Sequence, residues 1–76
     1  MSDTRDPLVT FLDRGGTRLA TGYSKNIPRT GDIVTFKERL YQVDRVTLDY
    51  EHVKDGPDMA LVVRRATVEL SEWANS

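Results

Sequence analysis

Strand signals dominate the pattern of hydrophobic and polar residues along this chain. Five segments are rich in the β-branched and aromatic residues that favour strands, and polar residues with glycine or proline separate them. We therefore expect an all-β protein. The five segments are residues 8–12, 17–23, 33–37, 40–50 and 60–70.

Segment 40–50 changes its hydrophobic phase near the middle, where the apolar residues switch from odd to even positions. A pleated strand holds both sets on one face only if an extra residue shifts the phase. The pattern therefore predicts a bulge or a sharp bend near Asp44 and Arg45. The two sets are Tyr41 with Val43, and Val46 with Leu48 and Tyr50.

Segment 60–70 changes phase in the same way, at Arg64 and Arg65. Two long strands that both change phase are what a sheet needs in order to curl back on itself. The alternative is that each strand is buried on both faces at one end. The two sets are Leu61 with Val63, and Ala66 with Val68 and Leu70.

Turn signals separate the segments. Gly15 and Gly16 supply the backbone freedom of a hairpin turn, residues 38–39 form a tight reversal, and the polar residues 51–58 form a flexible hairpin loop. A loop with Pro28 and Gly31 precedes the third segment.

We expect a single domain, residues 1–76, that folds as a five-stranded antiparallel curved sheet or barrel with a short C-terminal turn or tail. Residues 1–7 and 71–76 are expected to be flexible or peripheral, with Trp73 either closing one end of the sheet or exposed as an anchor for a partner. The expected core is Phe11, Leu19, Ile33, Val34, Phe36, Tyr41, Val43, Val46, Leu48, Leu61, Val63, Ala66, Val68 and Leu70.

The size of the chain leaves room for one small core, since a domain this short buries roughly 60% of its unfolded surface. The chain has no cysteine and one histidine, so neither a disulfide nor a zinc cage is expected to support the fold. The lack of cysteine fits a reducing cytoplasm. The N-terminal residues lack an apolar signal core, and the longest apolar run, residues 59–63, is too short to span a bilayer. We therefore expect a cytoplasmic protein with no membrane contact.

The chain offers little material for catalysis. His52 is the only histidine, and it lies in a polar segment beside Glu51. The carboxylates of residues 55–58 flank a glycine and a proline, which is typical of a turn and lacks the alternating oxygen ligands of a calcium loop. No nucleophile with a base and no phosphate-binding glycine loop is present. We expect a non-enzymatic protein without a cofactor or a metal.

Charge is distributed unevenly along the chain. Residues 14–45 carry seven cations against three carboxylates, whereas residues 46–76 carry three cations against six carboxylates. Acidic groups around exposed apolar residues suit a protein partner whose own surface is basic. The alternative is a solvated hairpin. The candidate partner-binding residues are Asp49, Glu51, Asp55 and Asp58, with Tyr50 and Trp73.

The basic half of the chain suggests a second kind of partner. An exposed tyrosine ring can stack on a base while nearby cations contact phosphates, as in small barrels that bind single strands. The candidate residues for nucleic acid or a nucleotide are Tyr23, Lys25, Arg29, Arg39 and Arg45.

Part of the chain resembles a known family of small barrels. Residues 28–48 are similar to the central segment of Src-homology-3-like barrels, which occur in translation-associated modules, phage connector proteins and short bacterial or phage proteins. The resemblance implies a barrel that is mostly non-enzymatic and binds RNA, DNA, peptides or copies of itself. It carries no functional residue across. The residues that carry it are Pro28, Gly31-Asp32-x-Val34 and Tyr41-x-Val43-x-x-Val46.

Three functions are therefore expected, in this order. The first is a non-catalytic protein that contacts another protein, for instance a phage or mobile-element accessory factor that inhibits a host protein. The second is a barrel that binds single-stranded nucleic acid or a nucleotide. The third is a structural subunit, a homo-oligomer that associates through the open edge of its sheet.

Overall fold

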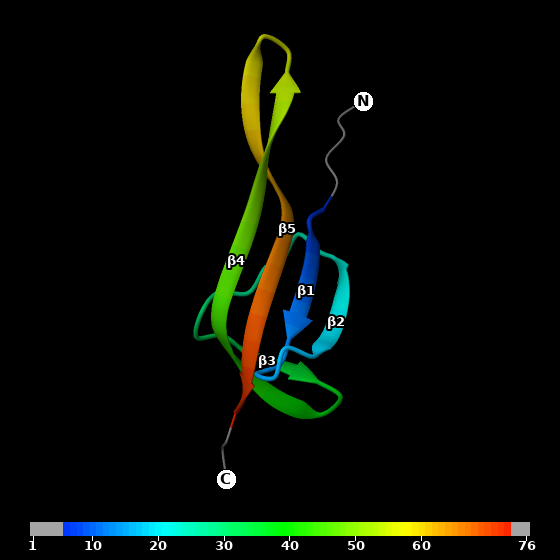
Figure 1. Ribbon diagram of the computed structural model, residues 1–76, viewed down its shortest axis with the longest axis vertical. Coiled ribbons are helices and arrows are strands. Elements are labelled where there is room, and N and C mark those ends of the chain that lie inside the picture. Colours follow the sequence, from blue (N-terminus) through cyan, green and yellow to red (C-terminus); the bar gives the residue numbers. More distant parts are fainter. Residues whose placement is uncertain (1–5, 74–76) are drawn as a thin grey trace.

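A computed structural model of the chain describes residues 6–73, in which there is no helix. Five strands form one sheet in the order β2-β1-β5-β4-β3 (Figure 1). The sheet curls through 221° and forms a half-barrel, so the prediction of a small curved all-β fold is confirmed. The strands are β1 (Leu8–Leu12), β2 (Arg18–Tyr23), β3 (Ile33–Phe36), β4 (Arg39–Asp55) and β5 (Asp58–Glu72).

The sheet is mixed, which corrects the expectation of purely antiparallel strands. β1 pairs with β5 in parallel, from Leu8 opposite Arg65 to Leu12 opposite Glu69. The other three pairs are antiparallel. Turn signals in a sequence report only on strands that follow one another. The β1–β5 pair joins opposite ends of the chain, so no local signal sets its direction.

Both predicted phase changes are confirmed as register shifts between β4 and β5. Val43 lies opposite Leu70 and Arg45 lies opposite Glu69, so Asp44 is an extra residue in β4. Further along the pair, Arg64 is an extra residue in β5. Each bulge keeps the apolar residues on both sides of it on one face of the sheet.

The interior face of the half-barrel holds a small core. Its buried residues come mostly from the first part of β4 and the last part of β5, and Val9 of β1 joins them although the predicted core did not include it. Three residues expected in the core are instead exposed: Ile33 at 44%, Leu48 at 37% and Leu61 at 61%. The buried residues are Val9, Tyr41, Val43, Ala66, Val68 and Leu70, with Phe11, Leu19, Ile27, Val34, Phe36 and Val46 packed against them.

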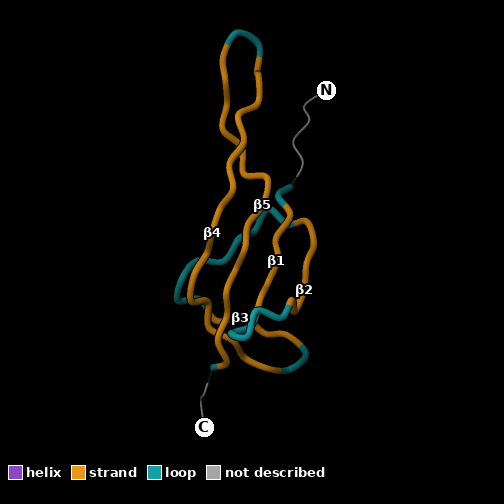
Figure 2. Tube along the Cα trace, in the orientation of Figure 1, coloured by secondary structure: helices purple, strands orange, loops and turns teal. Residues whose placement is uncertain are grey.

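Ile33 is exposed because its side chain lies on the outer face of β3. Val34 and Phe36 of β3 turn toward the core, and Ile33 therefore points to the outer face, as the alternation of a strand requires. The connection from β2 to β3 runs from one edge of the sheet to the other and contributes Ile27 to the core (Figure 2).

The turn between β3 and β4 lies one residue earlier than expected. Phe36 pairs with Arg39, so Lys37 and Glu38 are the two turn residues. Both have positive φ, at 47° and 66°, which is the backbone of the two-residue turn that matches the twist of a hairpin. The position of this turn is hard to predict from the sequence, because neither residue is the glycine or asparagine that usually occupies such a turn.

Candidate protein-binding surface

The β4–β5 hairpin extends far beyond the rest of the sheet. β1 pairs with β5 only from Arg65 onward, so residues 49–64 form a two-stranded arm (Figure 1). Seven residues per strand make the arm about 23 Å long, at about 3.3 Å per residue, and the longest axis of the molecule is 55 Å. The segment expected as a loop, 51–58, is therefore mostly strand, because cross-strand pairs continue to Asp55 opposite Asp58.

One face of the arm continues the interior face of the half-barrel. Leu48 lies opposite Ala66, which is fully buried, and Tyr50 lies on the same face because it is two residues further along β4. The bulge at Arg64 places Val63 opposite Tyr50 on this face. We call this surface the apolar arm face; it consists of Tyr50, His52, Lys54, Met59, Leu61 and Val63.

Among the described residues, the apolar arm face is uncovered. The side chains of Met59 and Leu61 are each 61% exposed, and Tyr50 is 58% exposed. A two-stranded hairpin is marginally stable in water unless something packs on it. Contiguous apolar patches on a protein surface generally mark sites of interaction. The apolar arm face is therefore the candidate site.

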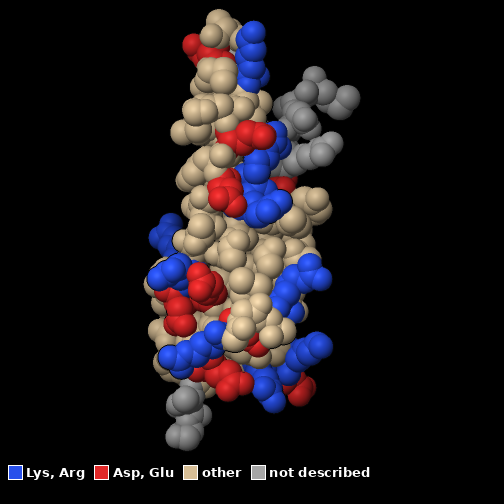
Figure 3. All heavy atoms as spheres, in the orientation of Figure 1, with Lys and Arg blue, Asp and Glu red and all other residues tan. Residues whose placement is uncertain are grey.

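The opposite face of the arm carries charges of both signs, which lie side by side in Figure 3. Arg64 Nε donates a hydrogen bond of 2.6 Å to Glu51 Oε2, and Asp49 lies opposite Arg65 in the register of β4 and β5. These cations offset the carboxylates in the arm. Because the ion pair is largely exposed, it contributes at most about 1 kcal/mol to stability.

The structure places four of the residues predicted to bind a protein partner along the arm, with Asp49 at its base and Asp58 at its tip. Asp49, Glu51 and Asp58 are exposed on the arm, and Tyr50 lies between two of them in the sequence. Tyr50 nevertheless points to the opposite face from its neighbours, because successive side chains in a strand alternate. Tyr50 therefore lies on a different face from Asp49 and Glu51, which share their face with Val53, Ala60 and Val62.

Two other predicted partner residues lie elsewhere. Trp73 follows the end of β5 and donates its backbone N–H to Leu40 O at 2.9 Å, at the end of the molecule remote from the arm. Its side chain is 41% exposed. The side chain of Asp55 lies outside the part of the chain that the structure describes.

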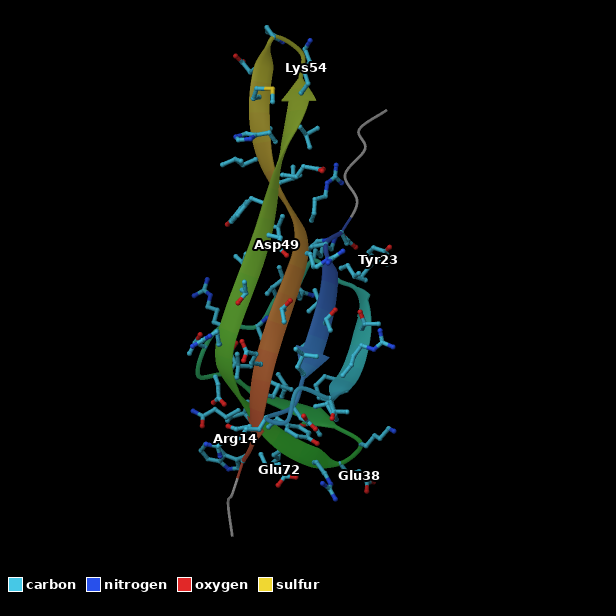
Figure 4. All side chains as sticks on the ribbon, viewed as in Figure 1. Arg14, Tyr23, Glu38, Asp49, Lys54 and Glu72 are labelled. Atoms are coloured by element: carbon cyan, nitrogen blue, oxygen red, sulfur yellow. The ribbon has the colours of Figure 1, made fainter. Side chains whose placement is uncertain are left out.

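Two of the residues predicted to bind nucleic acid, Tyr23 and Arg39, lie far apart. Tyr23 lies opposite Leu8, level with Arg65 of β5, whereas Arg39 bonds to Glu72 at the far end of that strand. Seven residues of strand separate these levels, or about 23 Å. Figure 4 shows Tyr23 and Glu72 toward opposite ends of the body.

Leu61 belongs to the candidate surface, although the sequence pattern assigns it to the core. Leu61 was expected in the core because it shares a face with residues that are buried there. The distance of Leu61 from the buried residues along the strand is the signal that could have distinguished it from the core. Leu61 lies five residues before the first position of β5 that is fully buried, Ala66, and within residues 6–73 the pairing of β1 with β5 ends at Arg65.

His52, the only histidine of the chain, is exposed on the apolar arm face opposite Leu61. In the part of the chain that the structure describes, no three histidine, aspartate or glutamate residues gather closely enough to hold a metal ion. Residues 6–73 also contain no helix long and apolar enough to cross a membrane.

Comparison with models of protein families, with curated proteins and with solved structures found no match to this chain.

Proposed function

We propose that this protein is a non-catalytic binding protein that contacts another protein through the apolar arm face. The observation that carries the proposal is the continuation of the core face into an arm that no other described segment covers. A partner that packs on this face would bury Tyr50, Met59 and Leu61. Large side chains of this kind often contribute most of the binding energy at interfaces.

The charges of the arm support the same function. His52 and Lys54 lie among the apolar residues on the same face, opposite Leu61 and Met59. Protein interfaces combine apolar groups with polar ones, and these polar groups give the partner features to recognise.

A finer form of the proposal names the class of protein. A cytoplasmic phage or mobile-element accessory factor that inhibits a host protein would need little more than a small rigid body and one binding surface. A barrel of the Src-homology-3-like kind is a suitable body, and the half-barrel with its bulged central hairpin supports that assignment.

The test is capture of a partner by the immobilised protein from a lysate of the cells in which its gene occurs. We expect Leu61→Glu to abolish capture, because a charge in an apolar contact must be desolvated. Ala60→Glu is the matched control: it adds the same charge one residue away, on the opposite face, and should retain capture. Circular dichroism establishes that both variants are folded.

Equal capture by both variants would refute the arm as the interface. Sedimentation of the purified protein at several concentrations tests the remaining alternative, self-association. A dimer that Leu61→Glu dissociates would show that the apolar arm face binds a second copy of this chain instead of a different protein.

A further inference from the structure

The half-barrel is open between its two edge strands, and a cavity lies there. β2 and β3 are the edges of the sheet, and in the described part of the chain they do not pair with each other. Where the start of β2 approaches the β3–β4 turn, there is a cavity of about 320 Å³. We call it the mouth; its lining is Arg18, Leu19, Phe36, Lys37, Arg39 and Tyr41.

The floor of the mouth is apolar. The rings of Phe36 and Tyr41 meet edge to face with centroids 6.2 Å apart, and Phe11 packs on Phe36 from the other side at 4.9 Å. Leu19 completes the floor from β2. Edge-to-face contacts of this kind are favourable, and they give the floor an aromatic surface on which an apolar side chain can pack.

The rim of the mouth is positively charged. A second cavity of about 520 Å³ shares Leu19, Arg39 and Tyr41 with the mouth, and its lining adds Arg14 together with the carboxylates Asp13 and Glu72. Arg39 forms an exposed ion pair with Glu72 at 3.0 Å. Among the side chains that the structure describes, no ion pair joins Arg14, Arg18 or Lys37 to a carboxylate.

Asp13, a carboxylate beside the mouth, already has hydrogen-bond partners, whereas Glu38 is exposed in the turn between Lys37 and Arg39. Asp13 Oδ1 accepts hydrogen bonds from the backbone N–H groups of Gly15 and Thr17, both at 2.9 Å. These bonds organise the β1–β2 turn, in which Asp13 lines the second cavity together with Arg14 and Arg39. Among residues 6–73, the lining of the mouth itself contains Arg18, Lys37 and Arg39 and no carboxylate, so the mouth favours an anionic ligand.

The edge of β3 adds backbone groups to the same opening. The backbone N–H of Val43 donates a hydrogen bond of 2.8 Å to Asp32 O, and bonded pairs alternate along an antiparallel ladder. Val34 and Phe36 consequently bond to β4, whereas the N–H and C=O groups of Ile33 and Thr35 point outward. Such a row of unpaired groups accepts another strand.

We infer that the mouth binds an acidic peptide segment in extended conformation, which adds to the edge of β3. Its backbone pairs with Ile33 and Thr35, one apolar side chain enters the floor, and its carboxylates lie beside Arg18 and Lys37. The site is distinct from the arm and does not rest on the function proposed for it.

The structure favours a peptide over single-stranded nucleic acid at this site. Bases bind small barrels by stacking on exposed aromatic faces, but Tyr41 is only 6% exposed and Phe36 is packed against the core. An open strand edge can form main-chain hydrogen bonds with an extended peptide backbone, whereas a nucleic acid has no such backbone.

The experiment measures binding of a fluorescein-labelled peptide of about ten residues, long enough to span a strand edge, in which glutamate and valine alternate. We expect binding that weakens about tenfold in the double variant Arg18→Glu/Lys37→Glu, in line with loss of two exposed charge contacts. Lys25→Glu/Arg29→Glu is the matched control, since it changes net charge equally outside the mouth and should bind as the parent does.

A second variant tests the strand edge without changing charge. Thr35→Pro removes one outward N–H, and proline is tolerated on the open side of an edge strand, so binding should fall while circular dichroism stays unchanged. Equal loss in both double variants would overturn the proposal. So would unchanged binding by Thr35→Pro, or an oligothymidylate of similar length that binds more tightly than the peptide and loses its affinity in Arg18→Glu/Lys37→Glu.

Discussion

Single residues control the sharp turns of this protein. Lys37 and Glu38 hold positive φ in the β3–β4 turn, a conformation that costs roughly 1 kcal/mol for a residue with a Cβ. The turn persists because the strands on either side are paired from Phe36 opposite Arg39 onward. Here the pairing of β3 with β4 overrides the preference of the turn residues.

This strain leads to a prediction for Glu38. Replacement Glu38→Gly should raise the free energy of unfolding by about 0.5–1 kcal/mol, because glycine adopts a φ of this sign without a steric penalty. Glu38→Ala is the control: it removes the same carboxylate but keeps the Cβ, and should give no gain. Urea denaturation measures both, and a gain in the alanine variant would show that charge, not backbone strain, was relieved.

At the scale of the element, the bulges decide which residues face the core. β4 and β5 are long strands whose apolar residues change parity, and one extra residue in each restores a common face. Asp44 has a further contact, since its Oδ1 accepts a hydrogen bond of 3.0 Å from Ser71 Oγ. The bulge in β4 thus shifts the register of the strand, and its extra residue also forms a side-chain hydrogen bond with β5.

The bulge predicts opposite outcomes for two deletions. Removing Asp44 alone leaves Arg45 opposite Glu69 and Val46 on the core face, so the protein should fold with a free energy of unfolding lower by about 1–3 kcal/mol. Removing both Asp44 and Arg45 turns Val46 outward and should abolish folding. Thermal melts followed by circular dichroism distinguish the two, and similar stability of both deletions would contradict the assigned register.

At the scale of the whole molecule, the protein has two parts. The body is the half-barrel, which holds the core, and the arm is the hairpin of residues 49–64, whose described residues lie outside the core. The core residues of β4 and β5 all lie below the level of Arg65, where β1 joins the sheet. The arm contributes hydrogen bonds and cross-strand contacts but few buried side chains. It is therefore expected to serve binding more than stability.

Shortening the arm tests this division. Tyr50 lies opposite Val63, so replacing residues 51–62 by Asn-Gly should close the hairpin with a two-residue turn. We expect a folded body whose melting temperature changes by no more than about 5 °C, corresponding to roughly 1 kcal/mol, and complete loss of partner capture. Loss of folding would show that the arm supports the body and would remove the argument for a dedicated binding element.

Much of the fold was predictable because strand signals are local. The alternation within residues 40–50 and 60–70 required an extra residue in each, and both bulges are found where the parity changes. The residues of the candidate site were only partly predictable. Asp49, Tyr50 and Glu51 were identified as a group, but their division between two faces depends on the register of β4 against β5.

The sequence by itself determined the strands, the two bulges and most of the core, because the period of a strand and its turn residues are properties of neighbouring positions. Only the tertiary structure decided that β1 lies parallel to β5 and that their pairing begins with Leu8 opposite Arg65. That contact between distant segments leaves Tyr50, Met59 and Leu61 beyond the body. Whether an apolar row becomes core or binding surface depends on what packs against it, and the packing partners are far away in the chain.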